Sequence, residues 1–510
     1  MKSYILKIAI FATGLSGIVA EYILSTLATY FLGDSVVQWT LIISVMLFAM
    51  GLGSRLSRYL ETDLVIKFIT IEFLLSLFVA FSPLLAYMAS AFTVYTGMII
   101  YTLAIIIGLM IGMEIPLVIR LNSELQELKI NVSSVIENDY YGSLLGGVFF
   151  VFVGLPILGI TYTPFVLGLI NFTVAVALVI MIREAISEKL AKITLAGSAV
   201  LLVLVAGFFT AQPIIFFGEQ AKYKDKIIYE EQSKYQKIVL TEWKDNYWFY
   251  LNGNLQLSTL DEFLYHEPLV HPIMNLVKNP SNVLVLGGGD GNATREILKY
   301  QSVKKITLVD LDPAVTNLAK TNEIFLDMNK GSLLNPKVEI INTDGYNFVE
   351  ETKEFYDVII VDLPDPRSVE LGRLYSHEFY VKCSKILRPH GAIITQAGSP
   401  YYASKAFLCI EKTIKSAGFS TLKMHNQVLT MGQWGWVLGS KSIPQEKLRN
   451  AALSLKFDQI ELNWLNNEAM HLITSFGKDI FSLQIDSVKV NKIHNPVLYR
   501  YYLDGNWDIY

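Results

Sequence analysis

Long apolar stretches fill residues 1 to about 217, and a mixture of polar and apolar positions typical of a soluble domain follows. A helix needs about 20 apolar residues to cross the core of a bilayer. Stretches near that length cover residues 4–32, 36–53, 64–88, 93–119, 141–160, 162–183 and 193–217. The first contains Glu21 and is followed by further apolar stretches, unlike a cleavable signal peptide. The pattern predicts a multi-pass α-helical membrane domain of about seven helices over residues 1–218.

From residue 219 onward the pattern first predicts short β-strands and then strands that alternate with helices. Residues 227–229, 237–243 and 248–251 predict short strands, and Asn252-Gly253 predicts a hairpin turn. Later strands are expected at 283–286, 305–310, 338–342, 356–362, 392–396 and 434–439, with helices between them. This alternation predicts a Rossmann-like, methyltransferase-type α/β domain with a doubly wound sheet, preceded by a small β-hairpin subdomain.

The soluble half divides into three predicted parts. We expect the small β subdomain at 219–265, the Rossmann-like domain at 266–440 and a C-terminal extension at 441–510. We interpret the extension as a small helical segment that packs on the domain and contributes no site residue.

Glycines and carboxylates follow the expected parallel strands, at the edge where such sheets bind ligands. The first strand runs into residues 287–291, Gly-Gly-Gly-Asp-Gly, where a ligand can approach the backbone. The carboxylate of Asp290 would repel a pyrophosphate and suits a positively charged ligand. Asp310 follows the second strand, where an acid commonly holds ribose hydroxyls, and Asp344-Gly345 follows the third, placed to meet an adenine edge. This set favours an adenosyl sulfonium over NAD.

The fourth strand ends in Asp362-Leu363-Pro364-Asp365-Pro366, two carboxylates braced by prolines. An alkylammonium has a pKa near about 10 and must lose a proton before its nitrogen can attack carbon. One aspartate can anchor an ammonium while the other accepts the proton of the attacking nitrogen. The attack would fall on the methylene carbon beside the sulfonium and needs no metal. Much of the rate would come from holding the two substrates in line.

Composition narrows the classes of protein further. Hydrophobic residues make up 52% of the chain and charged residues 17%, against roughly 25% charged in an average soluble domain. The net charge of -4 and the lack of a basic patch argue against nucleic-acid binding. Cys383 and Cys409 lack metal-ligand spacing, so we expect two core residues and no disulfide framework.

Short motifs occur in a fixed order along the second half of the chain. They are Tyr235-Gln236, the run from Asp261 to Glu267, the run from Gly287 to Gly291, Asp310-Leu311-Asp312, Asp344-Gly345, the run from Asp362 to Pro366, and the run from Ser376 to Tyr380. Each is weak alone, but the ordered set resembles the spermidine synthases, the polyamine aminopropyltransferases. The resemblance covers residues 229–440, and the apolar half resembles the N-terminal extension of the membrane-bound members.

The resemblance implies decarboxylated S-adenosylmethionine as co-substrate, with no other cofactor, and a diamine acceptor such as putrescine. Products would be spermidine and methylthioadenosine. The implied nucleoside contacts are Gln236, Gly287, Gly289, Asp310, Asp344 and Gly345, the amine contacts are Tyr265, His266, Asp290 and Asp365, and the proton acceptor is Asp362. It also implies a homo-oligomer, a dimer or tetramer. Structural alternatives exist for three residues: a structural histidine at His266, a core aromatic at Tyr265 and a polar strand residue at Gln236.

Several positions depart from the resemblance. The family usually has glutamate where Asp310 stands, and Arg367-Ser368-Val369-Glu370 replaces its usual Gly-Pro pair. Leu429 stands where the family has a tyrosine that helps to seat the diamine. Arg367 and Arg373 are unfavourable beside a diamine unless each is paired with an acid such as Glu370. These departures leave the identity of the acceptor open.

Positive charges in the first half predict which ends of the apolar stretches face the cytoplasm. Lys and Arg lie near the N-terminus and in the connections between the second and third, fourth and fifth, and sixth and seventh apolar stretches. The other connections between stretches carry none. The positive-inside rule then places the N-terminus in the cytoplasm and, after seven spans, the soluble half outside. The donor implied by the resemblance favours the cytoplasm instead, as do Lys222, Lys224 and Lys226 after the last stretch. One stretch is therefore re-entrant, or the domain is extracytoplasmic.

Three carboxylates lie within apolar stretches, Glu21, Glu72 and Glu114. Charges at membrane depth are costly and often functional. Glu114, two residues before Pro116, could line a cavity for a cationic polyamine; alternatively, these acids lie near span ends or bond to a neighbouring helix.

We therefore compare a membrane-anchored aminopropyltransferase with a polyamine transporter or sensor whose synthase-like domain does not turn over. The acids within the membrane half and the missing tyrosine favour the second hypothesis. Asp362 beside Asp290 and Asp365 favours the first, because a binder needs charge but no base. A small-molecule methyltransferase shares the fold, but these acids and Tyr265-His266 count against it.

Overall fold

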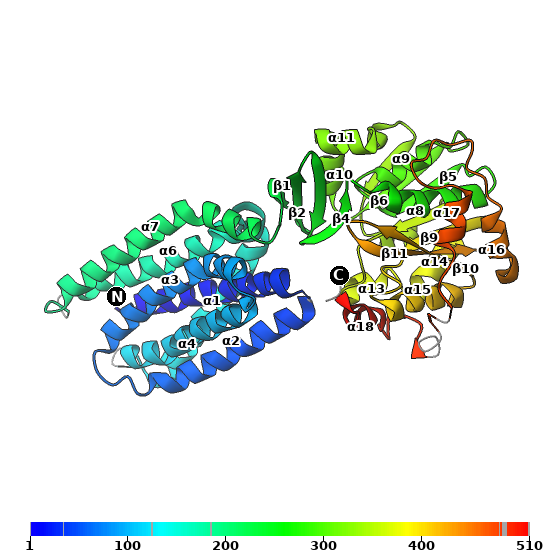
Figure 1. Cartoon of the computed structure of the whole chain (residues 1–510). Coiled ribbons are helices and arrows are strands. Elements are labelled where there is room, and N and C mark those ends of the chain that lie inside the picture. Colours follow the sequence, from blue (N-terminus) through cyan, green and yellow to red (C-terminus); the bar gives the residue numbers. More distant parts are fainter. Residues whose placement is uncertain are drawn as a thin grey trace. The chain divides into compact units, whose positions relative to one another are not determined.

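The computed structural model describes residues 2–33, 35–123, 126–183, 186–478, 480–481 and 487–507. The chain forms two units, Met1–Asp225 and Lys226–Tyr510 (Figure 1). The boundary lies a few residues beyond the predicted one at 218, because the last helix of the first unit continues to Gln220 and a short turn follows it.

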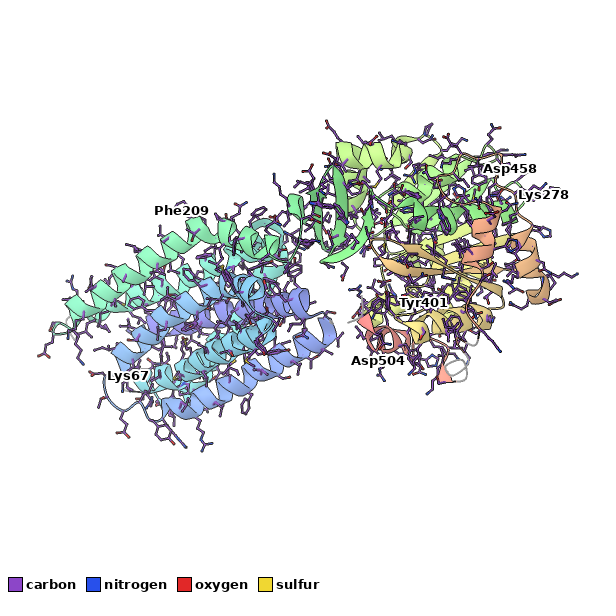
Figure 2. The ribbon with its side chains drawn as sticks, in the orientation of Figure 1. Lys67, Phe209, Lys278, Tyr401, Asp458 and Asp504 are labelled. Atoms are coloured by element: carbon purple, nitrogen blue, oxygen red, sulfur yellow. The ribbon has the colours of Figure 1, made fainter. Side chains whose placement is uncertain are left out.

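Long helices form the first unit. They are α1 (Lys2–Leu32), α2 (Ser35–Ser57), α3 (Leu64–Phe92), α4 (Thr96–Asn122), α5 (Leu128–Phe149), the π-helix η1 (Phe150–Leu158), α6 (Gly159–Ile182) and α7 (Leu190–Gln220). Within the described residues, six helical runs are long and apolar enough to cross a membrane. Large apolar side chains on their outer faces are exposed, such as Phe209 on α7 at 75% (Figure 2).

One of these runs, Leu128–Ile182, contains the predicted stretch 141–160 and all but the last residue of the predicted stretch 162–183. The run does not continue straight, because η1 interrupts it and Gly159 has a positive φ of 65°. A Cβ on Gly146 in α5 would touch Leu15 of α1, and Asn171 in α6 accepts a 2.8 Å hydrogen bond from Ser16 of the same helix. A straight helix would separate residues 146 and 171 by about 37 Å. The chain therefore folds back between α5 and α6.

Glycines let the helices of the first unit approach one another closely. A Cβ added to Gly112 of α4 would collide with the backbone of Met50 on α2, and one on Gly53 of α2 would collide with Leu109 of α4. Small residues at these crossings therefore set how closely α2 and α4 can pack.

The carboxylates inside the apolar stretches are buried within the helical unit. Glu72 and Glu114 are fully buried, and Glu72 accepts a 3.4 Å hydrogen bond from Thr13 of α1. A neighbouring helix therefore supplies a hydrogen-bond donor to Glu72.

The second unit begins with a four-stranded antiparallel sheet in the order β1-β2-β3-β4. Its strands are β1 (Lys226–Gln232), β2 (Lys237–Trp243), β3 (Asn246–Leu251) and β4 (Asn254–Ser258). Asn252 and Gly253 turn the chain between β3 and β4, both with positive φ, as a type I′-like hairpin requires. Helix α8 (Phe263–Leu276) then leads into the larger domain.

A seven-stranded mixed sheet in the order β10-β11-β9-β8-β5-β6-β7 forms the centre of this unit (Figure 1). Its strands are β5 (Asn282–Gly287), β6 (Lys305–Asp310), β7 (Val338–Asn342), β8 (Tyr356–Asp362), β9 (Leu387–Gln396), β10 (Ser420–Val428) and β11 (Gly432–Ser440). β5 to β9 run parallel, whereas β11 is antiparallel to both of its neighbours, β9 and β10. Strand β10 was not predicted. Only three residues connect it to β11, too few for a parallel crossover.

Helices cover both faces of this sheet. They are α9 (Asn292–Leu298), α10 (Pro313–Thr321), α11 (Glu323–Asn329), the 3₁₀ helix η2 (Ser332–Leu334), α12 (Gly345–Glu351), α13 (Val369–Arg373), α14 (His377–Ile386) and α15 (Ser404–Ser416). Val283 and Val285 of β5 belong to one buried cluster and Leu284 and Leu286 to another. Alternate residues of a strand point to opposite faces, so both faces of the sheet are buried, as in other α/β proteins.

The C-terminal extension is helical in part. It contains α16 (Gln445–Leu453), α17 (Asn467–Ile473) and α18 (Leu498–Leu503). α18 lies against α15 and α13. Cys383 and Cys409 are buried and unpaired, as predicted.

The close α2–α4 crossing generates a stability prediction. Gly112→Ala places a methyl group against the backbone of Met50, so we expect the helices to be forced apart at a cost of about 1–3 kcal/mol. The measurement is the thermal unfolding midpoint of the full-length protein in detergent. Gly51→Ala is the matched control, because a Cβ there meets nothing within 4 Å. Equal midpoints for the two variants would contradict this packing.

Candidate functional site

The carboxyl ends of four adjacent parallel strands bring the predicted site residues to one edge of the sheet. The register pairs Gly287 at the end of β5 with Asp362 at the end of β8. On the other side of β5, β6 ends in Asp310, and the backbone N–H of Thr343 after β7 donates to the carbonyl of Asp310. The doubly wound topology therefore assembles residues that lie far apart in the sequence.

The glycine loop touches both neighbouring strand ends. Gly287 has φ 81°, and a Cβ there would collide with the Asp362 carbonyl. The backbone N–H of Gly288 donates to that carbonyl at 3.0 Å. Gly289 donates its N–H to Asp310 Oδ2 at 3.1 Å, and a Cβ on Gly289 would lie 2.6 Å from that oxygen. Glycine is required here because the loop has no space for side chains.

Asp310 is fixed by backbone donors at the end of β6. Its Oδ1 accepts from the N–H of Asp312 at 2.9 Å, in addition to the bond from Gly289. Burial raises its pKa to about 6, although these N–H groups favour the ionised form. A carboxylate held in this way can accept hydrogen bonds from a pair of ribose hydroxyls.

Gln236 reaches the same region from the small sheet. Its side-chain amide donates to Asp312 Oδ2 at 3.0 Å, and the hydroxyl of Ser233 donates to the same oxygen at 2.6 Å. Asp312 also caps α10 through the N–H of Ala314. Asp312, which follows Asp310 by two residues in the sequence, thus orients the side chain of Gln236.

Asp344 and Gly345 lie at the start of α12. Asp344 Oδ1 caps the helix at the N–H of Asn347, and Oδ2 pairs with Arg373 at 2.7 Å. Gly345 lies beside Leu286 and Leu374, and a Cβ there would make ordinary contacts. Asp344 therefore already has two partners, which hold its carboxylate in place beside β6.

An acidic cluster occupies the other side of the glycine loop. One ligand atom from each of His266, Asp290 and Asp362 lies within 4.8 Å of the others. His266 Nε2 is 4.0 Å from Asp290 Oδ1, and the hydroxyl of Tyr265 donates to Asp362 Oδ1 at 2.7 Å. Both Tyr265 and His266 are buried on α8. The structure thus places all four residues together.

His266 is kept protonated by a chain of charges behind it. Its Nδ1 is 2.8 Å from Glu262 Oε2, which Arg295 contacts at 3.0 Å. Burial alone lowers the pKa of His266, but the hydrogen bond and charge of Glu262 outweigh it and raise this pKa to about 9. The ring of His266 faces the carboxylates of Asp290 and Asp362, and its positive charge offsets part of theirs.

Asp362 has the properties of a general base near neutral pH. Burial raises its pKa to about 6, the positive charge of His266 opposes this rise, and Asp290 adds to it. The carboxyl group is therefore ionised at pH 7 but basic enough to accept a proton from an amine.

Asp365 lies three residues further on, with partners that the sequence did not predict. The hydroxyl of Tyr502 donates to Asp365 Oδ2 at 2.6 Å, and Arg367 Nη2 lies 3.5 Å from the same oxygen. Gln396 of β9 lies 3.4 Å from Oδ1. Burial raises the pKa of Asp365, while Arg367 opposes the rise.

The sequence interpretation needs correction at these positions. Arg367 and Arg373 are paired with acids as required, but with Asp365 and Asp344 in place of Glu370. Tyr502 belongs to the extension to which no site residue was assigned. Leu429, which replaces the expected tyrosine, is 68% exposed. Tyr502, Glu262 and Arg295 were missed because only tertiary contacts connect them with the strand ends, although Glu262 lies within the motif from Asp261 to Glu267.

Comparisons with known proteins agree with this geometry. Residues 262–450 match the spermine/spermidine synthase domain. A polyamine aminopropyltransferase of Oceanobacillus iheyensis is 40% identical over 97% of this chain and 96% of its own. Polyamine aminopropyltransferase 2 of Aquifex aeolicus is 41% identical over 98% of each chain. These relatives span both units.

Two solved structures each match about half of the chain. A spermidine synthase in complex with the transition-state analogue AdoDATO is 30% identical, with a TM-score of 0.46, and covers 52% of this chain and 89% of its own. A spermidine synthase from Thermotoga maritima covers the same share of this chain at 29% identity and a TM-score of 0.45.

The glycine loop generates a binding prediction. Gly289→Ala puts a methyl group against Asp310 Oδ2, so we expect nucleoside binding to weaken by about ten- to a hundredfold. The measurement is calorimetric titration of the full-length protein with methylthioadenosine. Gly372→Ala in α13 serves as control, because a Cβ there meets nothing within 4 Å. An unchanged affinity in Gly289→Ala would exclude this loop from the nucleoside site.

Proposed function

Because the chain belongs to the polyamine aminopropyltransferase family, we propose that it transfers the aminopropyl group of decarboxylated S-adenosylmethionine to putrescine. The products are spermidine and methylthioadenosine. The observation that carries the proposal is the cluster of Asp290, Asp362, Tyr265 and protonated His266 next to the glycine loop. It combines a base with negative charge for cationic substrates.

The nucleoside of the donor binds along the ends of β5 to β7. Asp310 accepts hydrogen bonds from the ribose hydroxyls, and Gly287 and Gly289 let the donor approach the backbone. Gln236, Asp344 and Gly345 bound the rest of this part of the site. Asp290 attracts the positive charge of the donor, because its carboxylate faces the cluster and its Oδ1 is held by the N–H of Asn292.

The acceptor lies between the two aspartates that follow β8. Asp365 anchors one ammonium group, and Asp362 accepts a proton from the attacking nitrogen. That nitrogen forms a bond to the methylene carbon beside sulfur while the carbon–sulfur bond breaks. The electron pair of the broken bond stays on sulfur, which leaves as a neutral thioether. Asp362 takes this proton from the ammonium before the attack, and the positive charge of the sulfonium ends on the nitrogen of the product, which keeps its other two protons.

Tyr265 and His266 keep Asp362 ready for this step. The Tyr265 hydroxyl fixes the direction of the carboxylate, and the imidazolium of His266 favours its ionised form. Holding both substrates in line supplies much of the rate.

We also propose that α1 to α7 hold this enzyme in a bilayer as a multi-pass protein and that copies associate as a dimer or tetramer. The long apolar helices and their exposed outer side chains support the first proposal. The second rests on the resemblance alone.

The proposed function is tested with purified full-length protein, decarboxylated S-adenosylmethionine and a panel of amines. We expect methylthioadenosine and aminopropylated putrescine in the mass spectrum. Asp362→Asn removes the base, so its turnover should fall by about a hundredfold or more while methylthioadenosine still binds. Asp327→Asn, at an exposed surface ion pair, is the matched control. Activity of Asp362→Asn at the wild-type level would refute the role of Asp362.

The raised pKa of Asp362 predicts an acid limb in the pH profile. The carboxyl group must be ionised to accept a proton, so kcat/KM should fall as the pH drops through about 6. Tyr265→Phe removes a donor that favours the ionised form, so this limb should move to higher pH. Tyr380→Phe is the control, since Tyr380 is also buried but has no part in setting the pKa of Asp362. A limb that Tyr265→Phe leaves unmoved would assign the titration to another group.

A further inference from the structure

One residue beside Asp365, at the proposed amine site, comes from the C-terminal extension. Tyr502 is 2% exposed and reaches Asp365 from α18 in the C-terminal extension. Its hydroxyl lies 2.6 Å from Asp365 Oδ2 and 3.4 Å from Arg367 Nη2. The Arg367 guanidinium lies 5.5 Å from the centre of the Tyr502 ring.

Hydrogen bonds and a ring contact within the C-terminal extension hold Tyr502 in place. The indole N–H of Trp507 donates to the Tyr502 carbonyl at 2.7 Å, and the two rings lie 4.7 Å apart. Asn491 accepts from the N–H groups of Val497 and Leu498 and donates to carbonyls of Gly372 and Tyr375. The extension is therefore tied to the segment that follows the acidic loop.

Arg367 contacts both the small β-sheet and the residues around Asp365. It donates to the side-chain carbonyl of Asn254 in β4, in addition to its contacts with Asp365 and Tyr502. Arg367 contacts Asp365, whereas the hydroxyl of Tyr265 contacts Asp362. Arg367 thus lies on the Asp365 side of the proposed acceptor site.

We propose that Tyr502 and Arg367 close the far end of the amine site and restrict the acceptor to a short diamine. This inference rests on the proposed function. Tyr502 orients the carboxylate of Asp365 towards the distal ammonium. A longer amine would place a further ammonium beyond Asp365, against the guanidinium of Arg367, and like charges in a partly buried site repel strongly.

Tyr502 also accounts for the missing tyrosine at Leu429. A phenol hydroxyl is still present on the amine side, but the extension supplies it from a helix more than seventy residues further along the chain. The extension is then a specificity element as well as a packing segment.

The experiment compares full-length wild type, Tyr502→Phe and Arg367→Gln with putrescine, cadaverine and spermidine as acceptors. Methylthioadenosine release gives kcat and KM for each. Tyr502→Phe should raise the KM for putrescine about tenfold with a smaller change in kcat, because a hydrogen bond to a charged anchor is lost. Arg367→Gln should raise the spermidine-to-putrescine ratio of kcat/KM about tenfold. The KM for the donor should not change in either variant.

Tyr499→Phe is the matched control, because its hydroxyl accepts a bond from its exposed neighbour Arg500 on the same helix. Thermal unfolding of each variant checks that it folds. A folded Arg367→Gln with an unchanged acceptor ratio, or a folded Tyr502→Phe with an unchanged KM, would overturn this inference while wild-type turnover upholds the proposed function. A wild type that releases no thioether with any amine would overturn both.

Discussion

The burial of Asp362 at the end of β8 is the constraint on which the site depends. The register of the parallel strands sets this carboxylate beside Gly287, and the Gly288 N–H binds its backbone carbonyl. Removal from water raises the pKa of a carboxyl group. The carboxylate is then a stronger base and better able to accept a proton from an amine. Three neighbouring groups adjust this effect. Tyr265 and His266 favour the charged form, and Asp290 disfavours it.

The charged residues behind Asp362 form a chain of alternating positive and negative groups. His266 faces the cluster as a cation because Glu262 stands behind it, and Arg295 in turn neutralises Glu262. A buried charge without a partner costs several kcal/mol, so the three residues behave as a unit. This arrangement leaves a net negative charge at Asp290 and Asp362, and the cationic substrates of the proposed reaction would complete the balance.

The two units solve different physical problems. Glycines in the first unit allow backbones of apolar helices to touch, since packing rather than a hydrophobic driving force holds helices together in lipid. Glycines in the second unit allow backbone to approach carboxylates. In both, a single added methyl group would meet backbone or a fixed oxygen, as at Gly112 and Gly289.

The sequence by itself determined the class of each half, because apolar length and strand–helix alternation are local properties. It also predicted that Asp362, Asp290 and Asp310 lie at one edge of the sheet, since residues that follow parallel strands meet there. It could not identify Tyr502 or the partners of Arg367, because these contacts join segments far apart in the sequence without any periodic pattern. The antiparallel hairpin of β10 and β11 was likewise decided by tertiary structure, where packing against neighbouring elements selects among conformations that the local sequence permits.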